Sequence, residues 1–114
     1  MMGYTLSRRN VIGGAAASAA VLTTTSLRAA GPVVHDVAIK SFTFEPAKVR
    51  VHVGDTIRWT NHDVAPHTAT ADEFGWDTEE IVKGDIGEVT VTEGMETSYF
   101  CAFHPHMKGS IEIL

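Results

Sequence analysis

The decisive stretch of this 114-residue sequence is Cys101-Ala102-Phe103-His104-Pro105-His106-Met107. Its cysteine is the only one in the chain, and a histidine and a methionine follow it at three-residue steps. Residues 97–101 have the composition of a β-strand, and Pro105 restricts the conformation of the loop that follows. Cys101, His104 and Met107 can therefore face a common point at the end of one strand.

A fourth donor, His67, lies 34 residues before the cysteine and directly follows a proline. One thiolate, two imidazoles and one thioether are the ligands of a trigonal copper site with a weak axial methionine. We therefore predict one copper ion, bound by His67, Cys101, His104 and Met107. A tetrahedral zinc site would use further cysteine or histidine ligands rather than methionine.

Each of these residues, taken alone, has a simpler explanation in packing. A single cysteine behaves most often as a small buried hydrophobe, and a methionine often fills a gap in a core. The regular three-residue spacing, with Pro66-His67 upstream, favours a metal site instead. His106 competes with His104 as a ligand. Because adjacent residues in a tight turn tend to point apart, we expect His104 to bind the metal and His106 to be exposed.

The first 30 residues have the pattern of an export signal. Arg8-Arg9 precedes an apolar run from Val11 to Leu22, and Ala29-Ala30 supplies small residues for cleavage. Paired arginines are typical of the bacterial twin-arginine route. An ordinary helix or a retained anchor is the alternative, but the apolar run is shorter than the about 20 residues that span a bilayer. We predict a twin-arginine-type signal peptide at 1–30, one domain at 31–114, and a periplasmic protein without stable membrane insertion.

The formal charge of residues 31–114 is strongly negative. All 14 acidic residues lie in this part of the chain but only six of the nine basic ones, which gives a formal charge of −8. Nucleic acid is excluded as a partner, because binding its phosphates requires clustered lysine and arginine. The charge would attract a basic redox protein, or it serves solubility alone. A small domain with one cysteine has no internal disulfide, and such domains often gain stability from a metal.

Residues 31–114 alternate apolar and polar side chains with the period of β-strands. The clearest segments are 49–53, 56–60, 89–92, 97–101 and 111–113. The phase of the alternation changes near Ser41, which predicts a bulge or bend there. Residues 61–87 show little periodicity, and within them 79–83 are expected to form one helical turn or an irregular edge strand. Together these patterns predict an all-β fold, an antiparallel sandwich or barrel.

Several aromatic residues and histidines have structural roles in this interpretation. Trp59 lies in an alternating segment and is predicted to be buried in the core. Trp76 is predicted to be a partly buried loop anchor, with a contact surface as the alternative. His52 is expected at the surface. His35 and His62 have no partner at the spacing of metal ligands.

The sequence resembles the cupredoxins, and most of all their amicyanin and pseudoazurin branch, over essentially all of residues 31–114. The stretches that carry the resemblance are Phe44-Glu45-Pro46, residues 54–61, Pro66-His67-Thr68 and residues 99–109. The two-residue gap between His104 and Met107 favours amicyanin, since pseudoazurins have a longer gap there. The resemblance implies a cupredoxin-like Greek-key β-sandwich, with the same four residues as copper ligands.

The resemblance further implies a periplasmic electron-transfer protein with one type 1 copper per chain, cycling between Cu(I) and Cu(II). The partners would be redox proteins, such as a periplasmic dehydrogenase as donor and a c-type cytochrome as acceptor, and the chain would be a monomer and not an enzyme. The alternative is a periplasmic copper-binding protein for storage, delivery or resistance. Proteins of that kind favour exposed methionine- or histidine-rich sites that release metal easily.

The sequence departs from the amicyanins at three positions. Thr68 stands where they usually have an asparagine whose side chain ties the two ligand loops together, and we expect Thr68 to make a shorter, weaker link. Phe103 replaces a proline, and His106 replaces an aromatic residue. These departures bear on the redox potential and the partner surface rather than on the ligand set.

Overall fold

The computed structural model describes residues 31–114, which form eight β-strands in two sheets and contain no helix. The signal peptide predicted for residues 1–30 lies outside the described part of the chain. Contacts group residues 32–114 into one compact unit. No helix among the described residues is long and apolar enough to cross a membrane.

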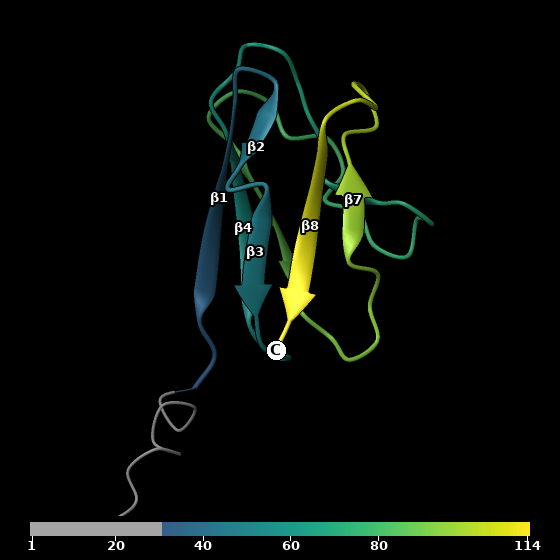
Figure 1. The fold of residues 1–114 in the computed structure, drawn as a ribbon. Helices are drawn as coiled ribbons and strands as arrows, with labels where there is room; N and C mark the ends of the chain where they lie inside the picture. Colours follow the sequence, from purple (N-terminus) through teal and green to yellow (C-terminus); the bar gives the residue numbers. More distant parts are fainter. Residues whose placement is uncertain (1–30) are drawn as a thin grey trace, which may run out of the picture. The chain divides into compact units, whose positions relative to one another are not determined.

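The two sheets have four strands each (Figure 1). In the first sheet the spatial order is β2 (Thr43–Glu45), β1 (Val34–Lys40), β4 (Thr56–Asn61) and β6 (Ile86–Thr90). In the second sheet the order is β3 (Lys48–Val51), β8 (Lys108–Ile113), β7 (Ser98–Phe100) and β5 (Thr70–Ala71). The predicted all-β sandwich is confirmed.

The expectation of purely antiparallel strands is wrong for two pairs. β1 runs parallel to β4, and β3 runs parallel to β8. Both parallel pairs join strands that are not consecutive, because the chain passes repeatedly from one sheet to the other. Alternation along a strand reports which face is buried but not the direction of the neighbouring strand, so the sequence pattern left this undetermined.

The core lies between the sheets and is centred on Trp59, which is fully buried as predicted. Its alternate neighbours in β4, such as Ile57, are also buried, and this follows from the period of two along a strand. The indole N–H of Trp59 donates to the hydroxyl of Tyr99 at 3.3 Å. Trp76 is half-buried in the loop after β5 and stacks on Trp59, which confirms its predicted role as a loop anchor.

The phase change near Ser41 corresponds to a tight hairpin turn rather than a bulge. Ser41 and Phe42 connect β1 and β2 and have positive φ angles of 53° and 59°. This geometry is that of a type I′ hairpin turn, which usually requires glycine or asparagine. Non-glycine residues in this region cost about 1–3 kcal/mol each and persist only where their surroundings hold them in place. The carboxylate of Asp63 does so by accepting hydrogen bonds from both backbone N–H groups, at 2.8 and 3.0 Å.

The segment between Asn61 and Gly87 has little regular structure beyond β5, as its lack of periodicity predicted. Residues 79–83 form no helical turn. Ile81 instead makes an isolated antiparallel bridge with His67, which agrees with the irregular-edge alternative. This bridge fixes the backbone of His67.

Candidate metal centre

The loop from Cys101 to Met107 closes on itself at the end of β7. The backbone N–H of Cys101 donates to the carbonyl of Met107 at 3.1 Å. Within the loop, the N–H of His104 donates to the carbonyl of Cys101, and that of Met107 to the carbonyl of His104, at 3.1 and 2.8 Å. These bonds return the chain to its starting point, so both ends of the loop are fixed near the thiol, as the three-residue spacing predicted.

His67 reaches the same point from the segment between β4 and β5. Its backbone N–H and carbonyl both pair with Ile81, at 3.1 and 2.8 Å. Thr68 then connects the two ligand segments: its hydroxyl accepts a hydrogen bond from the N–H of Ala102 at 2.8 Å. The N–H of Thr68 also donates to the sulfur of Cys101 at 3.4 Å. The link predicted for Thr68 is therefore present, and its length is that of an ordinary hydrogen bond.

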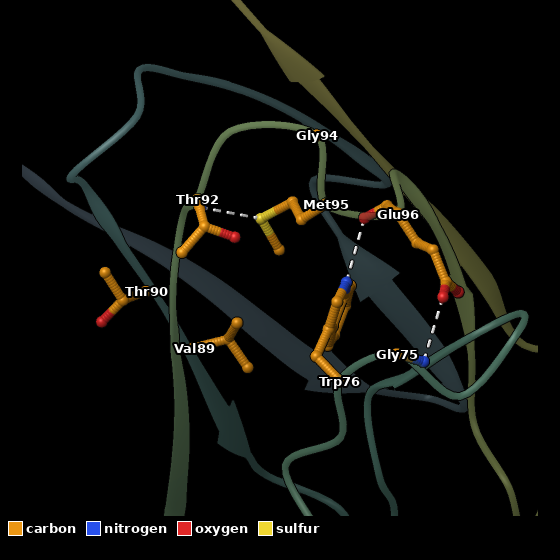
Figure 2. A pocket seen from close by; sticks show the side chains of 8 residues that line it. All are labelled: Gly75, Trp76, Val89, Thr90, Thr92, Gly94, Met95 and Glu96. Carbon is orange, nitrogen blue, oxygen red and sulfur yellow. Dashed lines mark hydrogen bonds between the residues drawn. The ribbon is translucent and has the colours of Figure 1, made fainter.

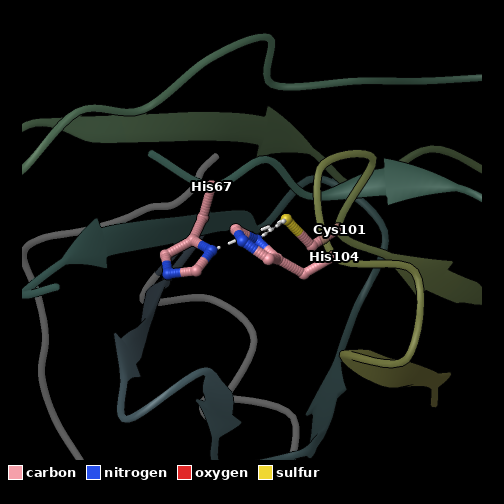
Figure 3. A group of neighbouring side chains, drawn as sticks. All are labelled: His67, Cys101 and His104. Atoms are coloured by element: carbon pink, nitrogen blue, oxygen red, sulfur yellow. Dashed lines mark hydrogen bonds between the residues drawn. The ribbon is translucent and has the colours of Figure 1, made fainter. Parts of the chain in front are cut away.

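The structure brings together three of the four predicted ligands, as Figure 3 shows. The Sγ of Cys101 lies 3.6 Å from Nδ1 of His67 and 3.7 Å from Nδ1 of His104. All three donor atoms lie within 4.8 Å of one another. Cys101 and His67 are fully buried, and His104 is half-buried.

These distances suit a bound first-row metal ion. With metal–sulfur and metal–nitrogen bonds of about 2.3 and 2.0 Å and angles between tetrahedral and trigonal, sulfur and nitrogen must lie about 3.5–3.7 Å apart. Both measured separations are in this range. A single soft thiolate with two imidazoles favours copper among such ions, so the donor set fits the predicted metal.

Asp63 orients the imidazole of His67. Its Oδ2 lies 2.9 Å from Nε2 of His67, so that nitrogen donates its proton and Nδ1 keeps the lone pair that a metal requires. Burial acts to raise the pKa of Asp63, but the hydrogen bonds from Phe42, His67 and Ser41 outweigh burial and hold that pKa below its ordinary value. The carboxylate therefore stays charged beside the ligand.

Phe42 packs against both imidazoles. Its ring meets that of His67 edge-on at a centroid distance of 5.1 Å, and that of His104 at 4.8 Å. Because Asp63 holds the Phe42 backbone as well as the His67 side chain, one carboxylate places an aromatic ring and a ligand together. Neither Asp63 nor Phe42 was identified from the sequence. The only signal was an acidic residue four positions before the predicted ligand.

Met107 and His106 occupy different environments. Met107 is 2% exposed at the end of the loop, where its backbone bonds to Cys101. His106 is exposed, and its ring centroid lies 6.5 Å from that of His104, outside the group of three donors. The axial role of Met107 remains a prediction.

The other histidines lie away from this group. Nε2 of His35 lies 2.8 Å from the buried carboxylate of Asp55, a pairing that the sequence did not indicate. Asp55 also accepts a hydrogen bond from the backbone N–H of His52 at 2.9 Å. His52 is half-buried, contrary to its expected place at the surface, whereas His62 is exposed.

Comparison with known proteins agrees with this geometry. A model of the cupredoxin-like domain family matches residues 13–113. The amicyanin of Paracoccus denitrificans is 31% identical over 93 residues, covering 75% of this chain and 67% of the relative. A solved amicyanin variant in its Cu(I) form has a TM-score of 0.64 at 29% identity, covering 71% of this chain and 82% of that one.

A second solved structure with a similar fold is a copper-containing nitrite reductase from Thermus scotoductus. Its TM-score is 0.66 at 26% identity, with 74% of this chain covered. The chain spans only 23% of the length of that reductase, so the likeness concerns one part of a larger protein. The chain therefore belongs to the cupredoxin family and resembles the amicyanins within it.

Proposed function

We propose that this protein is a one-electron carrier that binds one copper ion through His67, Cys101, His104 and Met107. The observation that carries the proposal is the position of two imidazole nitrogens at 3.6 and 3.7 Å from the only thiol of the chain. Copper supplies the redox chemistry by alternating between Cu(I) and Cu(II). The protein supplies a fixed set of donors and a surface for partners.

Electron transfer is fast when the site changes little between its two redox states. The surrounding contacts support such rigidity: Asp63 holds one imidazole, Thr68 donates to the thiolate sulfur, and the loop of Cys101 is closed by backbone hydrogen bonds. The half-buried ring of His104 offers the outlet for the electron. Phe103, next to His104 in sequence, is 49% exposed, and Val64, three residues before His67, is 83% exposed; both suit contact with a redox protein.

The cellular setting is proposed on sequence grounds. Residues 1–30 are a twin-arginine signal peptide, residues 31–114 are the exported domain, and the protein acts in the periplasm as a monomer. Its partners are redox proteins, with a dehydrogenase as donor and a c-type cytochrome as acceptor. The similarity to amicyanin supports this choice of partners.

Two other functions receive less support. Copper storage or delivery requires ligands that release the ion easily, whereas His67, Cys101 and Met107 are each at most 2% exposed. Catalysis requires an open position at the metal for a substrate. The ring of Phe42 packs against both imidazoles, and the proposed axial ligand Met107 is buried, which supports a carrier over an enzyme.

The function is tested by loading the purified protein with one equivalent of Cu(II). The expected results are an intense blue thiolate-to-copper absorption band and a reversible voltammetric wave. Cys101→Ser abolishes the band, His104→Ala weakens or removes it, and His106→Ala leaves it unchanged. A colourless or easily extracted copper complex would favour storage. Bleaching by His106→Ala but not by His104→Ala would refute the ligand assignment.

A further inference from the structure

His104 is the most accessible of the four proposed copper ligands. The other three, His67, Cys101 and Met107, are each at most 2% exposed, whereas His104 is half-buried. Nδ1 of His104 lies 3.7 Å from the thiol and faces the buried donors (Figure 3). Nε2 lies on another edge of the same ring and makes no hydrogen bond to any residue that the structure describes. An ion that approaches from solvent therefore meets His104 before the other three donors.

His106 places a second imidazole beside this ligand. Its side chain is exposed, and its ring centroid lies 6.5 Å from that of His104, with an interplanar angle of 82°. Only Pro105 separates the two residues, and its ring restricts the backbone that carries both of them. The two imidazoles are therefore held close together where the buried donors come nearest to solvent.

The separation of the two rings suits one shared ion. With metal–nitrogen bonds of about 2.0 Å, two imidazole centroids lie about 5 Å apart at a tetrahedral angle and about 6.3 Å apart when the nitrogens stand on opposite sides of the ion. The rings of His67 and His104, the pair proposed to bind the buried ion, are 4.9 Å apart and agree with the first value. The 6.5 Å between His104 and His106 slightly exceeds the second value. Rotation of the exposed His106 side chain, which is fast, removes this difference.

Other donors on the described surface are less suited to receive the ion. An apolar groove of about 410 Å³ is lined by one sulfur and one carboxylate, those of Met95 and Glu96 (Figure 2). Both already accept hydrogen bonds from backbone N–H groups, at 3.2 and 3.0 Å. His62 is exposed, but its ring does not pack against that of His104. Among residues 31–114, only His106 combines an exposed imidazole with ring contact to a proposed ligand.

Given the copper ligands proposed above, we propose that Nε2 of His104 and the imidazole of His106 form a surface site that captures aqueous Cu(II) before it enters the buried site. The ion first binds these two nitrogens and releases water. The ring of His104 then turns, so that the bonds to Nε2 and to His106 break and bonds to Nδ1 and to the sulfur of Cys101 form. The thiol proton passes to solvent, and the copper keeps its oxidation state throughout.

The capture site is tested by the kinetics of copper loading. Copper-free protein is mixed with an excess of Cu(II) in a stopped-flow instrument, and the appearance of the blue band is followed at increasing copper concentrations. We expect a rate that saturates with copper concentration. His106→Ala should lower the rate at low copper by at least about ten-fold, because two linked donors hold an ion more tightly than one. The final intensity of the band should not change, since the buried donors are the same.

Two further variants separate copper binding from packing. His106→Phe keeps an aromatic ring beside His104 but has no donor nitrogen, so it should load as slowly as His106→Ala. His62→Ala is the matched control, because it removes an exposed imidazole that does not pack against His104, and it should load at the wild-type rate. Loading of His106→Ala or His106→Phe at the wild-type rate, or equal slowing by His62→Ala, would overturn the capture site.

The captured ion is detected directly by freezing the mixture before the blue band appears and recording the electron paramagnetic resonance spectrum. We expect Cu(II) bound by two imidazole nitrogens without the thiolate in the wild type, and by one nitrogen at most in His106→Ala. An early signal with two nitrogens in both proteins would refute the assignment. This early signal does not require the blue site. A wild-type protein that shows it but never turns blue would therefore contradict the proposed electron carrier and not the capture site.

Discussion

Replacing Asp63 with alanine should destabilise the copper-free protein by about 2.5–5 kcal/mol, because one carboxylate joins two parts of the site. The hydrogen bonds from Ser41 and Phe42 are exposed, so water replaces them in part and each contributes about 0.5–1 kcal/mol. The bond from the fully buried ring of His67 is charge-assisted and contributes about 1.5–3 kcal/mol. The estimate is the sum of these three contributions.

Urea unfolding of the copper-free protein at neutral pH measures this difference. Glu80→Ala is the matched control, since it removes an exposed carboxylate and should change the free energy of unfolding by no more than about 0.5 kcal/mol. Asp63→Asn keeps the size of the side chain and should lie between the wild type and Asp63→Ala. A free energy of unfolding for Asp63→Ala within about 0.5 kcal/mol of the wild-type value would refute the reasoning.

The lowered pKa of Asp63 also predicts how the free energy of unfolding depends on pH. The pKa of Asp63 in the folded state lies below its ordinary value of 3.8, so the unfolded chain takes up a proton first as the pH falls. The stabilisation is therefore complete above about pH 5 and is lost as the pH falls through the lower, folded-state pKa. Asp63→Asn lacks this component. If the free energies of unfolding of Asp63→Asn and the wild type fell equally with decreasing pH, the lowered pKa of Asp63 would be contradicted.

Three further predictions concern the surroundings of the site. Phe42→Ala removes the ring that packs on both imidazoles and should weaken copper retention by about 10-fold or more, measured as the rate of release to a chelator. Thr68→Val leaves the N–H of Ala102 without its acceptor and should lower the free energy of unfolding in urea by about 1–3 kcal/mol, whereas Thr68→Ser should lower it much less. Burial raises the pKa of Tyr99 to about 12, against 10.0 ordinarily, so the unfolded chain ionises first. The free energy of unfolding should then fall between pH 10 and 12, by about 2–3 kcal/mol, and Tyr99→Phe should lack this fall. Copper release from Phe42→Ala at the wild-type rate would contradict the first prediction, and equal free energies of unfolding of the two Thr68 variants would contradict the second. The third would be contradicted if the free energy of unfolding of Tyr99→Phe still fell between about pH 10 and 12.

The sequence predicted those features that depend on local spacing. Cys101 and His104 come together because three residues separate them in a loop closed by its own hydrogen bonds. Trp59 is buried because its strand alternates with a period of two. The meeting with His67 was also predictable, since a mononuclear site with a single cysteine needs donors from elsewhere in the chain.

Features that depend on contacts between distant segments were not predictable in this way. The parallel direction of β1 and β4 is set by how the chain crosses between the sheets. Asp63 holds the Ser41–Phe42 turn, 21 and 22 residues away, and no local pattern records that contact. The pairing of His35 with Asp55 similarly joins residues 20 positions apart. In each case the partner is chosen by the fold and not by neighbouring sequence.

X-ray absorption at the copper edge tests most directly whether one thiolate and two imidazoles bind the ion. For the protein loaded with one equivalent of Cu(II), we predict one sulfur and two imidazole nitrogens at bonding distance, with the sulfur contribution absent in Cys101→Ser. A first shell of nitrogen and oxygen alone in the wild type, or a short sulfur contribution that persists in Cys101→Ser, would contradict the assignment.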